Sequence, residues 1–367
     1  MPTDKPRILH VIARHNVGGT ARYLNNLLPQ LADEIQTLLA VGHVQGHEIE
    51  DSSLVNIEFV RIEHLGRRIN PIQDIRAYLE IRKTIRSFKP QIIHSHTFKA
   101  GLLCRLMFLR IPKVHTFHGH LMSDPEFSRR ALQVIINIER RLARLTKKLI
   151  TVGEQVSKDL LQVSVGKPEK YVSIASEGEK LVFVSRSDAR RNLNLDQETP
   201  VVLWMARMAP VKNPSLALEV AQMLPEINFL MAGGGELFTQ IKEQAPPNVI
   251  LLSWVDAAEV IPAADIFLST SLNEGIPYSL IEVLSAGVPV VAVESGAISE
   301  IIQHKENGFL TSKVPAEIAN QISELFSNSA IRLAAGLSAL KSSARSDQVK
   351  KMAPAHIQVY KNLPLKK

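Results

Sequence analysis

Short apolar runs alternate along the chain with stretches of helical periodicity. In the first half, strand-like runs occupy 7–12, 36–41, 55–62, 91–96, 113–117, 149–152 and 171–174, and helical patterns occupy 23–31, 74–88, 99–109 and 128–146. Apolar residues three or four positions apart predict the helices, and short apolar runs bounded by turn residues predict the strands. Strands that alternate with helices through short turns favour a parallel, doubly wound sheet.

The pattern restarts after a polar, charged stretch at 176–198. Further strand-like runs lie at 201–205, 228–231, 249–252, 265–268 and 290–293, with helices predicted between them and after 314. A chain of 367 residues is long for one core and comfortable for two. We therefore expect an α/β protein with two doubly wound, Rossmann-like domains that face each other across a cleft, with the domain boundary near 178/179.

Composition narrows the class of protein. The one cysteine, Cys104, excludes an intramolecular disulfide and favours a reducing, cytoplasmic environment. The sequence shows no signal-peptide pattern and no apolar run of 18 residues, so we expect neither a leader nor a transmembrane helix.

Charge is distributed unevenly between the two halves. Residues 1–180 hold 27 Lys and Arg against 18 Asp and Glu, whereas the remainder holds 16 against 18. A basic first half indicates that this domain faces something anionic. Nucleic acid is disfavoured, because aromatic residues make up only 5% of the chain and no basic patch with interleaved aromatics occurs.

One segment concentrates this charge. Residues 129–148 carry seven basic residues and one acidic residue, Glu139, interleaved with aliphatic residues. Such a helix can lie on anionic lipid, or it can be an ordinary surface helix packed on the sheet. Residues 76–89 add positive charge to the same half, so the membrane interpretation stays open.

Polar features follow several predicted strands of the second half. Arg207 and Lys212 come after the strand at 201–205, where two cations can hold a diphosphate or can simply be solvated loop residues. Gly233–Gly235 follows the next strand and can bring backbone close to an anion or form a plain turn. Because Phe238 replaces the third glycine of G-x-G-x-x-G, the sequence argues against a nicotinamide or flavin enzyme.

The first half offers a second set of strand-end candidates. Gly18 and Gly19 join the first strand to the first helix, where their amides can border a ligand or cap the helix with Thr20. His118 follows the strand at 113–117 and can hydrogen-bond a ligand or fill a structural role. His94, His96 and His115 are nearby in the sequence, but a metal site is not predicted, because no HExxH or Cys/His cluster occurs.

Two glutamates are the most informative pair in the chain. Glu274 and Glu282 lie eight residues apart, between the strand at 265–268 and a small-residue turn at 286–289. This spacing places one carboxylate at the start of a predicted helix and the other within it, which suits a polyhydroxylated ligand whose phosphates lie at the helix N-terminus. No Asp-x-Asp pair occurs, so we expect Arg, Lys and helix amides, rather than carboxylate-held Mg²⁺, to hold the phosphates.

In order and spacing, these motifs resemble the retaining glycosyltransferase family 4 of the GT-B fold over roughly 7–312. The carriers are Gly18-Gly19, the strand end at 92–96, Phe117-His118-Gly119, Arg207 with Lys212, Gly233–Gly235, Glu274-Gly275-Ile276-Pro277 with Glu282, Ala286–Ala292, Gly296 with Glu300, and Asn307–Leu310. The E-x7-E element with its A-G-x-P-V-V-A tail is the specific part. The resemblance also implies domains over 1–178 and 179–348, and a segment at 349–367 that crosses back to the first domain.

The resemblance implies a role for each candidate residue. Arg207 and Lys212 bind the donor diphosphate, Glu282 the ribose and Glu274 the transferred sugar. The remaining donor contacts come from Gly18, Gly19, His118, Gly234, Trp254, Val255, Gly275, Ile276, Pro277 and Tyr278. With His118, Arg207, Lys212 and Glu274 as the catalytic set, the implied reaction needs no metal and no cofactor beyond a UDP- or GDP-sugar donor.

The implied function is transfer of a hexose-type sugar, with retention, to a glycan or lipid-linked acceptor in bacterial cell-surface polysaccharide or lipopolysaccharide synthesis. The expected location is cytoplasmic, with peripheral contact at the inner face of the membrane through the basic N-terminal domain. Two alternatives stay open. One is a nucleotide-sugar epimerase or phosphorylase of the same fold, and the other is a non-catalytic subunit that binds sugar nucleotides.

Overall fold

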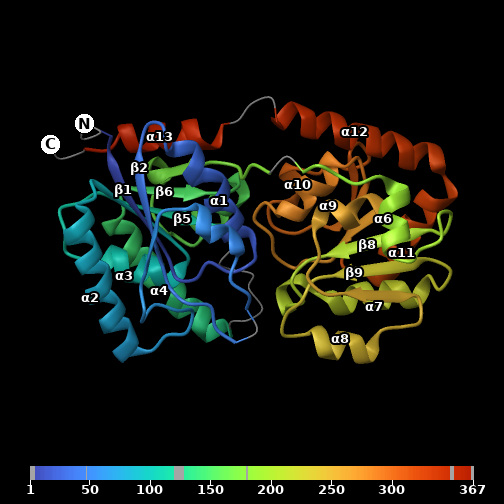
Figure 1. The fold of residues 1–367 in the computed structure, drawn as a ribbon, viewed down its shortest axis with the longest axis horizontal. Helices are drawn as coiled ribbons and strands as arrows, with labels where there is room; N and C mark the ends of the chain where they lie inside the picture. The colour runs from blue at the N-terminus through green and yellow to red at the C-terminus, as the bar shows by residue number, and fades with distance from the viewer. Residues whose placement is uncertain (1–4, 47, 120–127, 179–180, 348–350, 365–367) are drawn as a thin grey trace. The chain divides into compact units, whose positions relative to one another are not determined.

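The chain forms two compact units, each built around its own parallel sheet (Figure 1). The computed structural model describes residues 5–46, 48–119, 128–178, 181–347 and 351–364. Of these, the first unit contains everything up to 177 together with 351–364, and the second contains 178 and 181–347. Both junctions include residues outside the described ranges, so the exact domain boundaries stay predictions.

The first unit has a seven-stranded parallel sheet with the strand order β3-β2-β1-β4-β5-β6-β7. Chain order reverses between β1 and β4, which lie side by side at the centre. The strands are β1 Arg7–Ile12, β2 Gln36–Val41, β3 Phe59–Arg61, β4 Ile92–His96, β5 Lys113–Phe117, β6 Lys148–Thr151 and β7 Tyr171–Ser173.

Helices pack against the first sheet. They are α1 Gly19–Leu31, α2 Pro71–Phe88, α3 Phe98–Leu106, α4 Arg129–Leu145, α5 Glu154–Gln162 and the C-terminal α13 Met352–Lys361, with 3₁₀ turns η1 Ser52–Asn56 and η3 Pro168–Lys170. Helices α2 and α3 cover one apolar cluster with Ala77, Ile81 and Ile85 turned inward. Helix α13 packs against α1, so the end of the chain belongs to the first unit.

The second unit repeats the architecture with six strands in the order β10-β9-β8-β11-β12-β13. The strands are β8 Val201–Met205, β9 Asn228–Ala232, β10 Val249–Leu252, β11 Ile266–Ser269, β12 Val290–Val293 and β13 Gly308–Thr311. Chain order again reverses at the centre, between β8 and β11. In sheets of this kind, ligands bind beyond the carboxyl ends of the strands at such a reversal.

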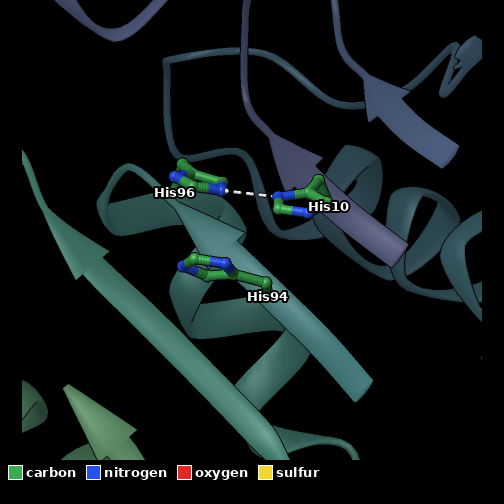
Figure 2. A group of neighbouring side chains, drawn as sticks. All are labelled: His10, His94 and His96. Carbon is green, nitrogen blue, oxygen red and sulfur yellow. Dashed lines mark hydrogen bonds between the residues drawn. The ribbon is translucent and has the colours of Figure 1, made fainter. Parts of the chain in front are cut away.

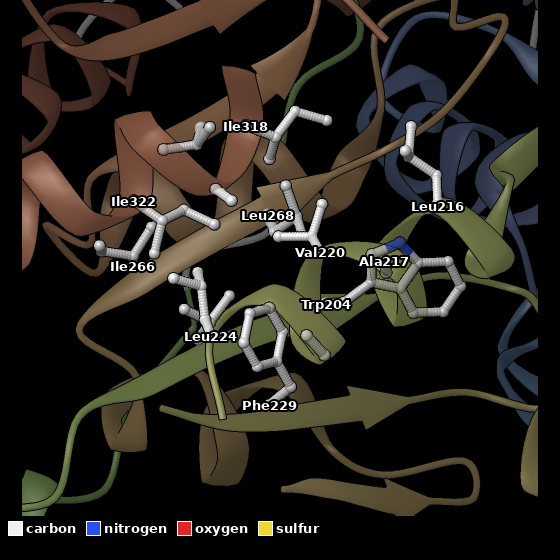
Figure 3. Packing of buried hydrophobic residues seen from close by; sticks show 14 of the residues in the cluster. Trp204, Leu216, Ala217, Val220, Leu224, Phe229, Ile266, Leu268, Ile318 and Ile322 are labelled. Carbon is white, nitrogen blue, oxygen red and sulfur yellow. The ribbon is translucent and has the colours of Figure 1, made fainter. Parts of the chain in front are cut away.

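Two apolar clusters lie against the second sheet. Figure 3 shows part of one, in which Trp204 and Phe229 from the sheet pack with Val220 of α7 and Ile322 of α11. The helices are α6 Arg186–Asn192, α7 Pro214–Met223, α8 Phe238–Gln244, α9 Ala257–Val260, α10 Tyr278–Ser285, α11 Pro315–Ser327 and α12 Ser329–Asp347, with 3₁₀ turns η4 Pro210–Lys212, η5 Ile261–Ala263 and η6 Ile298–Glu300.

The expectation of two doubly wound parallel sheets is confirmed. One local prediction was wrong, and two elements were not predicted. The run at 55–62 yields only the short β3, because Ser52–Asn56 turns as a 3₁₀ helix capped by Asp51. The polar stretch at 176–198 contains α6. Its Arg190 is buried and donates hydrogen bonds to backbone carbonyls and to Asp265. The strand at 308–311 completes the sheet although its run is too short to stand out.

The basic segment at 129–148 is mainly a packed helix. In α4, Ile135, Ile136 and Leu142 are buried, and Glu139 forms a buried two-pronged ion pair with Arg105. Since its aliphatic face is already used by the core, α4 is a poor candidate for insertion into lipid. Within the described residues, no helix is both long and apolar enough to cross a bilayer.

Candidate active site

The loops after β8 and β11 form the centre of the candidate site in the second unit. These strands are neighbours at the reversal of chain order, with Ile266 paired to Val202 and Phe267 to Leu203. Arg207 and Lys212 lie in the loop after β8, and Glu274 lies in the loop after β11. Three of the residues singled out in the sequence therefore follow the two strands where a ligand is expected.

A hydroxyl at the end of β11 ties these two loops together. Thr270 is fully buried, and its Oγ1 lies 2.9 Å from the carbonyl oxygens of both Lys212 and Asn213. The same oxygen accepts a 2.8 Å hydrogen bond from the indole Nε1 of Trp204. A backbone bond from Leu272 to Val211 adds to the connection. The position of Lys212 is therefore set by the sheet and not by a mobile loop.

Lys212 and Glu274 form an ion pair. Nζ of Lys212 lies 2.5 Å from Oε1 of Glu274, and the two side chains are 23% and 9% exposed. Arg207 is nearby in sequence and lies 3.5 Å from Glu236, measured from Nη1 to Oε2. The loop thus presents two cations, each with a carboxylate neighbour in the second unit.

The three glycines after β9 are required for close backbone packing. Gly233 has φ +131°, and a Cβ on it would lie 2.1 Å from the carbonyl oxygen of Ala206. A Cβ on Gly235, at φ +148°, would lie 2.5 Å from that of Met208. Backbone bonds from Met208 to Gly234 and from Leu237 to Met208 hold the loops together. The glycines therefore position the loop that contains Arg207. The sequence had left open whether they form a plain turn or an anion site.

Trp254 and Val255 follow β10 and are partly exposed, at 36% and 38%. The indole lies against Gly234, where a Cβ would come within 2.5 Å of Nε1. Asp256 ends the segment by capping α9 through the amide of Ala258. This leaves a flat, accessible ring next to the glycine loop.

Helix α10 carries the second glutamate. It begins at Tyr278 after Pro277, so Glu274 lies in the preceding loop and Glu282 lies about one turn into the helix. Both glutamates are buried, and Tyr278 is 7% exposed. The amide of Ala297 donates to the carbonyl of Glu274 at 3.0 Å, which fixes the loop containing Gly275 and Ile276. The helix N-terminus thus adds its partial positive charge beside the cations.

The candidates of the first unit lie at the matching reversal point. Gly18 and Gly19 follow β1, where Gly18 precedes α1 and Gly19 is its first residue and is exposed. Helix α1 has no side-chain cap, so Thr20 does not play the capping role that the sequence allowed. A Cβ on Gly18 would meet only the Asn16 carbonyl at 3.8 Å, an ordinary contact. The fold itself therefore does not require glycine at position 18.

His118 follows β5 and is held from two sides. Its Nε2 lies 3.0 Å from Nδ1 of His96, and its ring packs edge-on against Tyr23 at 4.7 Å between centroids. Loss of hydration, with a smaller effect of His356, lowers the pKa of His118 to about 3. The imidazole is therefore neutral at physiological pH and can donate or accept a hydrogen bond.

Three histidines of β1 and β4 form a buried cluster, shown in Figure 2. His10, His94 and His96 are inaccessible to solvent, and burial lowers the pKa of each far below its ordinary value. Nδ1 of His10 lies 3.1 Å from Nε2 of His96, which continues the chain of imidazoles from His118. Nε2 of His10 has no partner among the described residues.

This cluster has the ligand atoms for a metal but not the surroundings. Its candidate atoms lie within 4.8 Å of one another. However, His94 already bonds Tyr360 and Thr116, both at 2.7 Å, and both nitrogens of His96 are engaged by other histidines. The geometry is that of a hydrogen-bonded network of neutral rings.

The network also reaches the C-terminal helix. The hydroxyl of Tyr23 lies 2.8 Å from Nε2 of His356, whose Nδ1 donates to the carbonyl of Met352. Tyr360 of the same helix reaches His94. Sequence reasoning missed Tyr23, His10, His356 and Thr270. His10 lies beside His94 in the sheet register, and a pairing across 84 residues leaves no local signal in the sequence.

Models of known protein families match both units of the chain. A family model described as Glycosyl transferases group 1 matches residues 185–341, and one described as Glycosyltransferase Family 4 matches residues 17–174. Each model covers one of the two units. The chain belongs to the family 4 glycosyltransferases. It is accordingly a glycosyltransferase that uses a nucleotide-sugar donor.

Individual relatives of this glycosyltransferase are distant. It is 26% identical over 268 residues to a UDP-Gal:alpha-D-GlcNAc-diphosphoundecaprenol alpha-1,3-galactosyltransferase of Escherichia coli, covering 67% of the chain and 68% of the relative. It is 21% identical to the O-antigen biosynthesis glycosyltransferase WbnH of Escherichia coli, covering 86% and 89%. These relatives share its family and act in the synthesis of surface or lipid-linked glycans, as their names state.

Solved structures place the glycosyltransferase in the GT-B fold. Anabaena Alr3699/HepE in complex with UDP and glucose aligns with a TM-score of 0.82 at 21% identity, over 97% of this chain and 99% of that one. WaaG, a glycosyltransferase involved in lipopolysaccharide biosynthesis, aligns with a TM-score of 0.76 at 12% identity, over 96% and 99%. The expected fold class and family are confirmed by these comparisons.

Proposed function

We propose that this glycosyltransferase moves a sugar from a UDP-sugar to a lipid-linked or glycan acceptor, with retention of anomeric configuration and without a metal ion. The Lys212–Glu274 ion pair at the β8/β11 reversal carries the proposal. It puts a cation where the donor phosphates are expected and a carboxylate where the sugar hydroxyls are expected, within one hydrogen-bond length of each other.

The cations account for departure of the nucleoside diphosphate. Breaking the bond between sugar and phosphate builds negative charge on the leaving oxygen. Lys212 can place a point charge there, Arg207 can grip two oxygens with its fork, and the amides at the start of α10 add a partial positive charge. These groups neutralise the charge without carboxylate-held Mg²⁺, and this supports metal independence.

We assign the donor contacts in one consistent direction. Glu282 on α10 receives the ribose hydroxyls, and Trp254 and Val255 after β10 border the base next to Gly234. The loop Gly275-Ile276-Pro277 and the amide of Tyr278 border the sugar and the phosphates. From the first unit, His118 contacts the sugar, and Gly18 and Gly19 border the diphosphate. Support comes from the position of these loops within each unit, where they follow the carboxyl ends of the strands.

The proposal of UDP as donor base rests on relatives. The Escherichia coli galactosyltransferase is named for a UDP-sugar, and the Anabaena structure contains UDP. A GDP-sugar is the competing outcome. Membership in this family supports retention, and Glu274 is engaged by Lys212 and is therefore poorly placed as a nucleophile. Attack of the acceptor on the same face that the diphosphate leaves is the mechanism consistent with this arrangement.

The proposed acceptor is a lipid-linked glycan of a bacterial cell-surface polysaccharide. The named relatives act on a diphosphoundecaprenol-linked sugar or in O-antigen synthesis. The excess of basic residues in the first half of the chain suits an acceptor with an anionic diphosphate. An acceptor of this kind places the enzyme at the inner face of a membrane.

Two measurements test the proposed function. Thermal unfolding with UDP, GDP, ADP and their sugars should show the largest stabilisation with UDP compounds, since a ligand that binds only the folded state raises its stability. Incubation with donor should give product only when a lipid-linked or glycan acceptor is present. A sugar altered without acceptor would indicate an epimerase, a requirement for orthophosphate would indicate a phosphorylase, and donor binding with no product from an acceptor panel would indicate a non-catalytic subunit.

A further inference from the structure

Helix α2 presents an unusual outer face. Ile72, Ile75 and Leu79 are 66%, 63% and 57% exposed, and Ile69, just before the helix, is 68% exposed. Positions separated by three, four or seven residues share one side of a helix, so the three helical residues form a continuous aliphatic stripe. Large aliphatic side chains gathered on a surface indicate a contact with an apolar partner.

Cations continue along the same face. Relative to Ile72, the exposed residues Arg76, Arg82, Lys83 and Arg86 lie at positions four, ten, eleven and fourteen, within the same sector of the helix. The face therefore has an aliphatic half toward the N-terminus of α2 and a basic half toward its C-terminus. We call it the α2 face, formed by Ile72, Ile75, Arg76, Leu79, Arg82, Lys83 and Arg86.

The acidic residues of α2 do not offset this charge, because both are paired toward the body of the unit. Asp74 lies 2.5 Å from Nζ of the buried Lys99, and Glu80 lies 2.5 Å from Nδ1 of His64. Lys99 also donates to the carbonyl of Arg68, so the start of the helix is held firmly. The α2 face is thus rigid, aliphatic and basic before any partner arrives.

The aliphatic residues of the α2 face are not needed by the core. Ala77, Ile81 and Ile85 on the opposite side fill the apolar cluster beneath α2 and α3. By contrast, the two exposed aliphatic residues of α4, Val134 and Leu145, are eleven positions apart and do not form a stripe. Helix α12 exposes Ile331, Leu333, Leu337 and Leu340, but among its described side chains Lys341 is the one exposed cation, so the row of cations seen on α2 is lacking there.

We infer that the α2 face is the docking surface for an anionic lipid bilayer, with Ile72, Ile75 and Leu79 entering the boundary between head groups and acyl chains and the four cations contacting lipid phosphates. A helix that lies in the membrane plane needs this combination of an aliphatic stripe with a basic flank. The inference rests on the proposed function in one respect. Docking would bring the enzyme to the membrane surface, where a lipid-linked acceptor lies.

The test is sedimentation of the full chain with vesicles of phosphatidylcholine alone and of phosphatidylcholine mixed with phosphatidylglycerol. The unchanged protein should sediment with the mixed vesicles only, and less at high salt. The apolar variant Ile72→Ser/Ile75→Ser/Leu79→Ser should bind at least about tenfold more weakly. The charge variant Arg82→Gln/Lys83→Gln/Arg86→Gln should lose about a hundredfold, since each cation near an anionic surface contributes about fivefold.

Matched control variants distinguish the α2 face from exposed apolar side chains and cations elsewhere on the chain. Leu333→Ser/Leu337→Ser on α12 removes exposed leucines elsewhere, and Arg130→Gln/Arg141→Gln/Arg144→Gln on α4 removes three exposed cations of the same unit. Both should bind vesicles like the unchanged protein. The inference is overturned if the unchanged protein ignores anionic vesicles or if the α4 variant loses as much binding as the α2 charge variant. It is also overturned if the apolar variant keeps full binding and instead dissociates a dimer in sedimentation velocity.

A second readout keeps this inference apart from the donor site. Stabilisation by UDP and turnover with a short-chain, water-soluble acceptor should be unchanged in both α2 variants, whereas turnover with acceptor embedded in anionic vesicles should fall. If UDP fails to stabilise the chain while vesicle binding behaves as expected, the proposed donor is wrong and the docking surface stands. If UDP stabilises the chain and vesicles do not bind, the docking surface is wrong and the proposed donor stands.

Discussion

Nζ of Lys212 lies 2.5 Å from Oε1 of Glu274, and the loops that carry them follow the neighbouring strands β8 and β11 and are tied together by the Thr270 hydroxyl. The ion pair orients the two side chains toward each other. Preorganised charges contribute to catalysis because they need not be rearranged when the leaving group develops its charge. The pair is also a structural contact, and the two roles can be separated.

Lys212→Ala should lower both activity and stability. It leaves the Glu274 carboxylate buried without its cation, at a cost of about 2 kcal/mol for a pair of this partial burial. Loss of a charge at the leaving group should cut kcat/KM by about a thousandfold. The double variant Lys212→Ala/Glu274→Gln should recover most of the stability and none of the activity. Equal stability of the single and double variants in urea unfolding would show that the pair is not coupled.

Arg207→Ala should impair transfer while the fold survives. Its side chain is partly exposed and lies on a loop held by backbone bonds, so removing it should change the free energy of unfolding by less than about 1 kcal/mol. We expect kcat/KM to fall by about a hundredfold or more, with Arg207→Lys recovering only part of it. Glu236→Ala, which removes the neighbouring carboxylate, is the control and should retain near-normal turnover. Full activity in Arg207→Ala would remove this residue from the donor site.

Glu282→Ala should weaken donor binding more than it slows the chemical step. The carboxylate lies on α10 away from the bond that breaks, so a contact with the ribose should act on donor binding in both the ground and the transition state. The expected signature is a KM for donor raised by about tenfold or more with a smaller change in kcat. An unchanged KM for donor would argue against a ribose contact at this position.

Two glycine substitutions should have opposite consequences. In Gly233→Ala, a Cβ would meet the Ala206 carbonyl oxygen at 2.1 Å with φ at +131°, so we expect about 3 kcal/mol of destabilisation. In Gly18→Ala the new methyl group meets nothing closer than 3.8 Å, and the free energy of unfolding should be unchanged. If the backbone at Gly18 borders the diphosphate, the same variant should lose donor affinity. Thermal unfolding with and without UDP measures both effects.

The buried histidines should make stability depend on pH. Burial lowers the pKa of His10 to about 3 and of His356 to about 4, below the ordinary value of 6.5. The unfolded chain therefore binds more protons below pH 6.5. The stabilising contribution is complete above pH 6.5 and is lost as pH falls toward 4, by about 1.4 kcal/mol per pH unit for each such histidine.

Urea unfolding between pH 7 and pH 5 measures this slope. His356→Gln removes the titrating ring and preserves an acceptor for Tyr23 and a donor for the Met352 carbonyl, so it should reduce the slope without abolishing folding. An identical slope in this variant would show that His356 does not bind a proton on unfolding in this range.

Much of the architecture could be read from local pattern. The alternation of strand and helix signals, the restart near 200 and the spacing of Glu274 and Glu282 are properties of short segments, and they pointed to the fold and the family. Which segments became neighbours in the sheets could not be predicted from the local sequence. The run at 55–62 was misjudged because Asp51 caps a 3₁₀ turn inside it, and helix α6 was not predicted because its segment lacks apolar periodicity and is held by the buried Arg190.

By itself, then, the sequence determined two Rossmann-like sheets and the motifs that mark the family, since backbone periodicity and turn chemistry act over a few residues. Only the tertiary structure decided that Lys212 pairs with Glu274, that His10 joins His94 and His96 beneath His118, and that α2, not α4, leaves an aliphatic and basic face exposed. The reason is physical. Strand pairing and helix packing join positions tens to hundreds of residues apart, and burial of one helix face is settled by what the rest of the chain puts against it.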